Sequence, residues 1–146
     1  MSLNRIFDIA GSAMSAQSIR LNTTASNIAN ADTASSSTEE VYRARKPVFA
    51  SIQQSVMNNG FNTAFTDNPE SQGVEVKGIV ESEAPLDMRF QPDHPMANDD
   101  GYVMYPNVNV VEEMTDMLSA SRSFQTNVDV MDAAKTMMQR ILTLGQ

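Results

Sequence analysis

Hydrophobic side chains in the last third of the chain recur every seven residues. One row is Val110, Met117, Phe124, Met131 and Met138, and a second, interleaved row is Met114, Ser121, Val128, Lys135 and Leu142. Amphipathic helices of single globular domains are usually shorter and drift from a strict seven-residue spacing. The pattern therefore predicts a long coiled-coil helix from Asn109, its N-terminal cap, to Gly145, with Glu112 completing a capping box. Within the second row, Ser121 and Lys135 are interpreted as edge positions or as residues that set the register.

Residues 3–28 carry the same pattern. One row is Phe7, Met14, Leu21 and Ile28, and the other is Leu3, Ala10, Gln17 and Thr24. Because both ends of the chain show matching rows, we predict that they form two helices which pack against each other. Between Leu3 and Ala31 the only charged residues are Arg5, Asp8 and Arg20, so the remaining faces of this helix are expected to pack against neighbouring molecules. The alternative is a low-complexity N-terminal segment that stays disordered.

Intrinsic helix propensity is low in this first segment. Asn22, Thr23, Thr24, Ser26 and Asn27 are all poor helix formers. One seam between two helices buries too little apolar surface to offset the conformational entropy of ordering both segments. We therefore predict that both terminal segments are largely unfolded in the free chain and fold when neighbouring molecules supply more buried surface.

The middle of the chain is predicted to be a small β-rich module. A polar linker precedes a strand that begins near Val41 and is interrupted at Pro47. Residues 58–73 are expected to form a loop and residues 74–80 a strand, and Asp100-Gly101 is expected to form a hairpin turn before a further strand at 102–105.

The predicted fold class is mainly α, with two long terminal helices that form a coiled-coil seam and the β-rich module between them. The expected boundaries are 1–33 for the N-terminal helix, 34–40 for the polar linker, 41–105 for the small β-rich module and 106–146 for the C-terminal helix.

Composition excludes several classes of partner. The formal net charge of −8 argues against nucleic acid and against an anionic membrane surface, because both attract clustered Lys and Arg. The chain has no cysteine, which excludes disulfides and thiolate metal sites. No apolar run approaches the roughly 20 residues that span a bilayer. Residues 1–16 lack the pattern of an ordinary secretory signal, so export would need another route.

An enzyme is the main alternative from a different class. The single histidine, His94, lies near Asp93, Asp99 and Asp100, a set that could bind a metal or perform acid–base chemistry. However, His94 stands between two prolines in a segment typical of a turn, and no second His or Cys is available. The sequence also lacks a phosphate-binding glycine loop and a nucleophile elbow. We therefore expect no catalytic site, no metal and no cofactor.

Several short motifs resemble one protein family. Residues 25–33 (ASNIANADT) are similar to the N-terminal signature of the flagellar rod and hook axial proteins, and residues 105–114 (YPNVNVVEEM) and 119–127 (SASRSFQTN) resemble its C-terminal part. Together with 92–95 (PDHP) and 101–103 (GYV), they are closest to the flagellar basal-body rod proteins of the proximal rod. The motif residues are Ala25, Asn27, Ile28, Ala29, Asn30 and Thr33.

Asn27 and Asn30 have two possible roles within this motif. They are either hydrogen-bonding residues at the helix end or contacts to a neighbouring subunit, and the sequence leaves both open. Longer axial relatives often place a Gly-Tyr soon after the threonine, whereas here residues 34–41 precede Tyr42. This spacing favours the proximal rod branch of the family.

The resemblance implies a structural axial subunit of the bacterial flagellar basal body that builds the proximal rod and transmits torque across the periplasm. It further implies export from the cytoplasm by the flagellar type III apparatus without a cleaved signal peptide. The expected partners are copies of the chain itself, other rod proteins, the membrane-ring base of the rod and the export apparatus. No nucleic acid and no small-molecule substrate are expected.

Assembly is expected to use the seam residues within and between subunits. These residues are Leu3, Phe7, Met14, Leu21, Ile28, Val110, Met114, Met117, Phe124, Val128, Met131, Met138 and Leu142. Two alternatives share the heptads: another axial protein of the hook or distal rod, and a soluble cytoplasmic coiled-coil adaptor. An adaptor would need a charged, solvated outer face on its first helix, and this chain lacks one.

Overall fold

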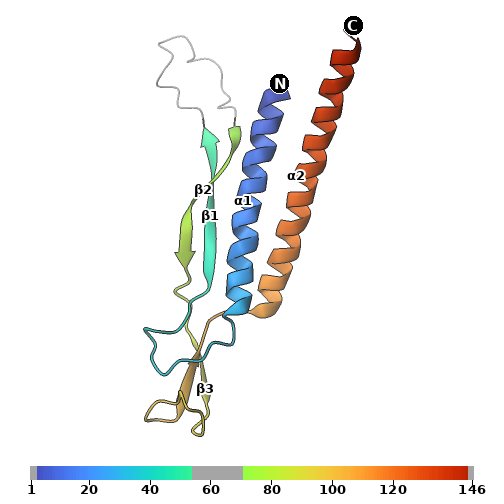
Figure 1. Cartoon of the computed structure of the whole chain (residues 1–146). Coiled ribbons are helices and arrows are strands. Elements are labelled where there is room, and N and C mark those ends of the chain that lie inside the picture. Colours follow the sequence, from blue (N-terminus) through green and yellow to red (C-terminus); the bar gives the residue numbers. More distant parts are fainter. Residues whose placement is uncertain (1–2, 54–70, 145–146) are drawn as a thin grey trace, which may run out of the picture.

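The computed structural model describes residues 3–53 and 71–144 and shows an elongated molecule (Figure 1). Two helices lie side by side along most of its length, and a hairpin of two strands runs along the first helix. A second, smaller pair of strands lies at the end of the molecule opposite to both chain termini. Most of the loop predicted at 58–73 falls outside the described residues.

The two predicted helices are confirmed. Helix α1 spans Leu3–Ala29 and helix α2 spans Val110–Leu144. They run antiparallel, so that the C-terminal end of α1 and the N-terminal end of α2 lie at the same level (Figure 1). Within the described part of the chain, neither helix combines the length and the apolar character needed to cross a membrane.

The hairpin alongside α1 consists of strands β1 (Arg45–Gln53) and β2 (Ser71–Glu81), which pair antiparallel. The strand predicted at 74–80 is therefore confirmed. The prediction that Pro47 interrupts the first strand is wrong, because β1 continues through Pro47, which stands opposite Ile79. Since β1 pairs with β2 alone among the described strands, one of its edges needs no ladder hydrogen bonds there, and proline is tolerated.

The second pair of strands was only half predicted. Strand β4 (Tyr102–Tyr105) follows the expected turn, where Gly101 has a φ of +79°. A Cβ at that glycine would lie 3.0 Å from Cε2 of Phe90, so both space and conformation favour glycine. Its partner β3 (Asp87–Phe90) was not predicted. Ser35, in the predicted linker, adds a bridge to Met104 through two main-chain hydrogen bonds of 3.0 and 3.1 Å.

The described architecture is a mixed helix-and-sheet fold, with one helix at each end of the chain and two small antiparallel sheets between them. Helix α1 is covered by α2 on one side and by the β1–β2 hairpin on another (Figure 1). The buried hydrophobic residues are Ala10, Ala16, Ala31, Val41, Ala44, Val103, Ala120 and Ala134. Because most of them are alanines, which bury little apolar area, the core of one copy is thin.

Candidate assembly surface

The face of α1 predicted from the heptads is largely covered. Phe7, Met14, Leu21 and Ile28 are half-buried, and Leu3 lies in the first turn of the helix. In the interleaved row, Ala10 and Thr24 are buried at 3% and 4% exposure. The N-terminal heptad pattern therefore marks a covered face of the helix.

One of the two predicted rows of α2 faces α1. Apart from an ion pair between Glu112 in its first turn and Lys46 of β1, α2 packs among the described elements against α1, so its covered side chains identify the face between the helices. Members of the first predicted row are all half-buried: Val110, Met117, Phe124, Met131 and Met138. A seven-residue repeat of covered side chains is thus present on α2.

The second row of this face differs from the predicted one by a single position. Its covered members are Glu113 (3% exposed), Ala120 (0%), Asn127 (half-buried) and Ala134 (4%). By contrast, Met114, Ser121, Lys135 and Leu142 are exposed, and Val128 is half-buried. For packing within one chain, the predicted second row is therefore wrong. Two of the four covered positions are alanines, whose small side chains let the helices approach closely, whereas Glu113 is a long side chain that is buried as well. Met114 and Leu142 stay a prediction for contacts between copies.

A polar contact also crosses the helix pair. Nη2 of Arg20 on α1 donates to Oδ1 of Asp116 on α2 at 2.7 Å. The side chain of Arg20 is 26% exposed and that of Asp116 is 33% exposed. Charge-assisted hydrogen bonds of this length are stronger than neutral ones. This ion pair links the two helices directly.

Asn27 of the family motif holds the hairpin against α1. Its side chain is fully buried, at 0% exposure. Oδ1 accepts from the main-chain N–H of Arg45 at 2.9 Å and from the hydroxyl of Tyr42 at 2.8 Å, while Nδ2 donates to the carbonyl of Arg45 at 2.8 Å. The amide thus binds both main-chain groups of one β1 residue, as a neighbouring strand would. Asn27 is therefore a hydrogen-bonding residue in the last turn of α1, which agrees with the helix-end role, although its partners are Tyr42 and the main chain of Arg45.

Asn30 and Thr33 have local roles at the end of α1. Nδ2 of Asn30 donates to the carbonyl of Ser26 at 2.8 Å, and the hydroxyl of Thr33 donates to the carbonyl of Asn30 at 2.7 Å. The same two carbonyls also accept from the main-chain N–H groups of Asn30 (3.1 Å) and Thr33 (3.2 Å), so the side chains add a second hydrogen bond to each where the helix ends. For Asn30 the helix-end role is therefore confirmed.

Asn107 is a second clamp, to which sequence reasoning assigned no role. Its Oδ1 accepts from the N–H of Ala44 at 2.9 Å, and its Nδ2 donates to the carbonyl of Ala84 at 2.8 Å. These contacts join the entry to β1, the segment after β2 and the entry to α2. The sequence carried one signal for this role: Asn107 stands between the proline that follows a predicted strand and the asparagine that caps the predicted helix.

The start of α2 is capped as predicted, but the capping box is not formed. Oδ1 of Asn109 accepts from the N–H groups of Val111 (3.1 Å) and Glu112 (3.4 Å). Glu112 instead accepts a hydrogen bond from Nζ of Lys46 on β1, at 3.0 Å. This hydrogen bond raises the pKa of Lys46 above its usual value, and the nearby carboxylates Glu113 and Asp116 act in the same direction.

Helix α1 approaches β2 closely at Ser12. Its hydroxyl accepts from the N–H of Val74 at 3.2 Å. Gly73 has a φ of +137°, and a Cβ at this position would lie 2.3 Å from Oγ of Ser12. Only glycine allows the strand to come this close to the helix.

His94, the candidate for an enzymatic site, is part of a turn. Its N–H donates to the carbonyl of Gln91 at 3.1 Å, and its Nδ1 accepts from the N–H of Met96 at 3.1 Å. Within residues 3–53 and 71–144, no three His, Cys, Asp or Glu side chains are grouped so that they could hold a metal ion. Nδ1 of His94 is therefore occupied by a hydrogen bond from the local main chain.

Comparison with known proteins gives matches over both ends of the chain. The family model described as "Flagella basal body rod protein" matches residues 7–34. The family model described as "Flagellar basal body rod FlgEFG protein C-terminal" matches residues 99–144. The first match includes Asn27, Asn30 and Thr33, and the second includes Asn107 and all of α2.

Similar proteins match along the whole chain. The flagellar basal-body rod protein FlgC of Yersinia enterocolitica is 47% identical, and that of Salmonella typhimurium is 44% identical; each match covers 100% of both chains. FlgC of Borreliella burgdorferi is 34% identical over 100% of this chain and 99% of its own length. With identity of this degree over its full length, the chain belongs to the flagellar basal-body rod protein family and, within it, to the FlgC group.

Proposed function

We propose that this chain builds the proximal flagellar rod by packing the helix faces that are exposed in a single copy against neighbouring subunits. As a member of this family, the chain is a structural subunit of the basal-body rod and not an enzyme. The proposal concerns how it assembles. It rests on the uneven distribution of apolar side chains between the core and the surface.

The observation that carries the proposal is that large apolar side chains lie outside while alanines lie inside. On the first turns of α2, Val111 is 73% exposed, Met114 57% and Leu118 53%. Their spacing of three and four residues places them on one side of the helix. A row of this kind in a chain of this size indicates a surface that another protein covers.

Helix α1 offers a complementary surface. Besides Ile9, its exposed residues recur at spacings of three, four and seven and include one charge: Asn4, Asp8, Ser15, Ser18, Asn22, Ala25 and Ala29. Small side chains let another helix approach closely, because the distance between helix axes depends on the side chains at the contact. This face supports the expectation that neighbouring molecules cover α1.

The predicted assembly residues divide between two tasks in this proposal. Half-buried members such as Phe7 and Phe124 hold α1 against α2, and exposed members such as Met114 and Leu142 contact other copies. Other rod proteins share this packing, and the membrane-ring base and the export apparatus are the partners at the start of assembly. Export without a cleaved signal peptide and transmission of torque across the periplasm complete the proposed role. These last points are supported by the family resemblance.

The test replaces Leu118 by aspartate in a strain that lacks its own copy of this rod protein. Leu118→Asp should leave expression and helix content unchanged, because the side chain is exposed, but should abolish incorporation into basal bodies and swimming. Ser119→Asp is the matched control, since Ser119 is exposed at the same level of α2 but on another face. Normal rods containing the Leu118→Asp chain would contradict the proposal.

A further inference from the structure

One edge of the smaller sheet has main-chain groups that no described strand occupies. Strand β4 pairs with β3 on one side and with Ser35 on the other. The N–H of Met104 donates to the carbonyl of Ser35 at 3.1 Å, and the carbonyl of Met104 accepts from the N–H of Ser35 at 3.0 Å. Met88 stands opposite Met104 on β3. Because both groups of Met104 point away from β3, Met88 directs its own N–H and C=O to the outer edge of β3.

Phe90 is oriented in the same way. Tyr102, which stands opposite Phe90, uses both of its main-chain groups on Asn98. Its carbonyl accepts from the N–H of Asn98 at 2.9 Å, and its N–H donates to Oδ1 of Asn98 at 2.8 Å. The N–H and C=O groups of Met88 and Phe90 therefore lie along the outer edge of β3 and have no partner among the described residues.

The side chains at this edge are apolar and exposed. Phe90 is 64% exposed and Met88 61%, and the rings of Phe90 and Tyr102 contact edge to face with centroids 5.3 Å apart. Edge strands of natural proteins are commonly protected by charged side chains, especially lysine. Here the same positions carry residue types that are enriched where proteins contact each other. We call the free main-chain groups of Met88 and Phe90, together with these two side chains, the β3 edge.

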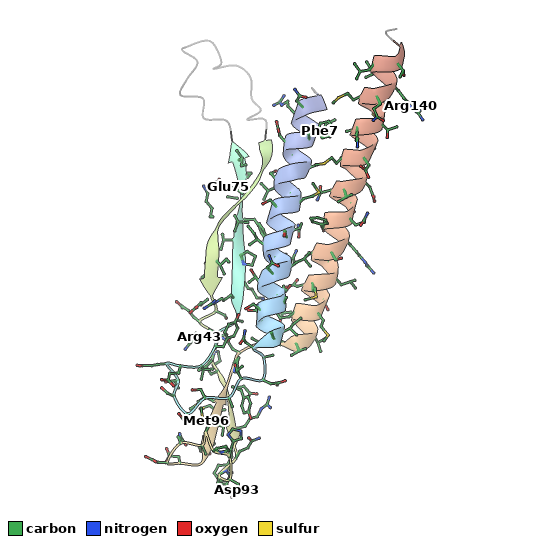
Figure 2. The ribbon with its side chains drawn as sticks, in the orientation of Figure 1. Phe7, Arg43, Glu75, Asp93, Met96 and Arg140 are labelled. Carbon is green, nitrogen blue, oxygen red and sulfur yellow. The ribbon has the colours of Figure 1, made fainter. Side chains whose placement is uncertain are left out.

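Acidic side chains surround the β3 edge. Asp93, Asp99 and Asp100 are exposed on the loop between β3 and β4. Figure 2 shows Asp93 at this end of the molecule. The arginine of β3, Arg89, is already bound to Asp87 at 2.9 Å. A partner of the β3 edge should therefore bring lysine or arginine as well as apolar side chains.

We propose that the β3 edge binds an extended segment of a different protein, which joins the sheet as a further strand beside β3. The main chain of this segment would pair with the free N–H and C=O groups, and its alternate side chains would cover Phe90 and Met88. A lysine or arginine of the segment would face the aspartates of the loop. The inference goes beyond the proposed function, because it uses none of the helix faces.

A second copy of this chain does not supply such a segment. Among the described residues, the extended stretch with several basic side chains is 43–48 (RARKPV), which leads into β1 and is already paired with β2. Lys135 and Arg140 lie in α2, where the main-chain groups are used within the helix. The net charge of −8 also opposes a contact between two copies at an acidic surface. The chemistry therefore selects an unlike protein.

The contact is short, because β3 has four residues. It covers far less than a standard interface of about 1,600 Å². The free chain and the partner segment should therefore associate weakly in dilute solution and stay bound where other contacts hold the two proteins together. Because opposite charges contribute, the association should weaken as salt is added and the screening length shortens.

Photo-cross-linking in purified basal bodies identifies the occupant. Phe90 is replaced by p-benzoylphenylalanine in a strain that lacks its own copy of this rod protein, and the basal bodies are irradiated. The expected product joins position 90 to one other protein, within a non-helical segment that carries lysine or arginine. The same replacement of Arg122, exposed on α2, is the control and should give none of this product. A product with a second copy or with a helix, or no product from chains that have entered basal bodies, would overturn the inference.

Two variants at Met88 separate the main chain from the side chain. Met88→Pro and Met88→Ala both remove the thioether, but only proline also removes the N–H at the outer edge. Proline is tolerated at an edge position whose N–H takes no part in the ladder. With p-benzoylphenylalanine at position 90, Met88→Pro should give about tenfold less product than Met88→Ala, the factor expected for one lost hydrogen bond. Equal yields from the two variants would exclude strand addition.

Charge reversal tests the same contact without altering the main chain of β3. Asp93→Lys with Asp99→Lys should lower the yield of the product about tenfold, because the partner is expected to be basic. Glu39→Lys with Glu40→Lys makes the same change of charge at two exposed positions before β1 and should leave the yield unchanged. An equal effect of both pairs, or no effect of the first, would contradict a basic partner at the β3 edge.

Incorporation separates this inference from the proposed function. If the chain with p-benzoylphenylalanine at position 90 enters basal bodies and gives no product, the contact at the β3 edge is wrong and the role of the helix faces stands. If Leu118→Asp builds normal rods while the product at position 90 still forms, the proposed function is wrong and the contact at the β3 edge stands.

Discussion

Replacing Asn27 by alanine should separate the β1–β2 hairpin from α1. The change removes two hydrogen bonds to the main chain of Arg45 and one from the hydroxyl of Tyr42, with distances of 2.8–2.9 Å, at a site with 0% exposure. A typical hydrogen bond contributes about 1 kcal/mol net, and leaving a buried main-chain group without a partner costs about 1–3 kcal/mol. We expect a loss of about 2–4 kcal/mol, the lower value applying if water enters the space left by the amide.

The measurement is a urea titration followed by circular dichroism. Because the free helices are expected to be loose, native chain and variant are compared in trimethylamine oxide, which favours the folded state. With a slope of about 2 kcal/mol per molar urea, the midpoint should fall by roughly 1–2 M.

Asn30→Ala is the matched control for this experiment. Asn30 lies three residues further along the chain, just past the end of α1, and its amide makes one local bond to the carbonyl of Ser26. Its loss should cost about 1 kcal/mol or less. Tyr42→Phe, which removes only one of the bonds to Asn27, should fall between the two. A midpoint shift for Asn27→Ala no larger than that of Asn30→Ala would refute the reasoning.

Three further outcomes are expected. Gly73→Ala should lower the free energy of unfolding by about 1–3 kcal/mol in the same titration, because a Cβ would clash with Ser12 and the backbone angle is unfavourable. The hydrogen bond to Glu112 raises the pKa of Lys46. The stabilisation from this bond is therefore complete below the ordinary lysine pKa of about 10.4 and is lost as the pH rises through the raised value. The urea midpoint of the native chain should fall across that pH range, and the midpoint of Lys46→Met should fall less. Phe124→Asp should reduce helix content and abolish incorporation into rods, and normal rods from it would contradict the packing of α2 on α1.

The terminal helices could be predicted from the sequence because both depend on a long periodic pattern. A hydrophobic repeat identifies a covered face but does not say what covers it. The interleaved row of α2 shows the limit: hydropathy favours Met114 and Leu142, whereas the covered positions are taken by Glu113, Ala120 and Ala134. In a subunit of a polymer, large apolar side chains are also needed outside, so the most hydrophobic row is not necessarily the inner one.

The two asparagine clamps could not be placed from the sequence. Asn27 and Asn107 bond to main-chain groups of Arg45 and Ala44, which are 18 and 63 residues away. Such partners depend on how the hairpin lies on the helices, and local propensity carries no information about that. Strand β3 was missed for a related reason: it has four residues, so its alternation of polar and apolar side chains is too short to indicate a strand, and pairing with β4 makes it one.

The interior of the fold around α1 is more polar than a heptad pattern suggests. Thr24, Asn27 and Glu113 are buried beside alanines, while Leu118 and Ile141 stay outside. Burial of alanine contributes little free energy, so hydrogen bonds with defined partners determine how one copy folds. The larger apolar side chains stay exposed in one copy, and their burial contributes to contacts between copies. Substitutions should therefore separate into two groups. Changes at Asn27 should alter the unfolding of a single chain, and changes at Leu118 should leave the single chain intact and prevent the polymer.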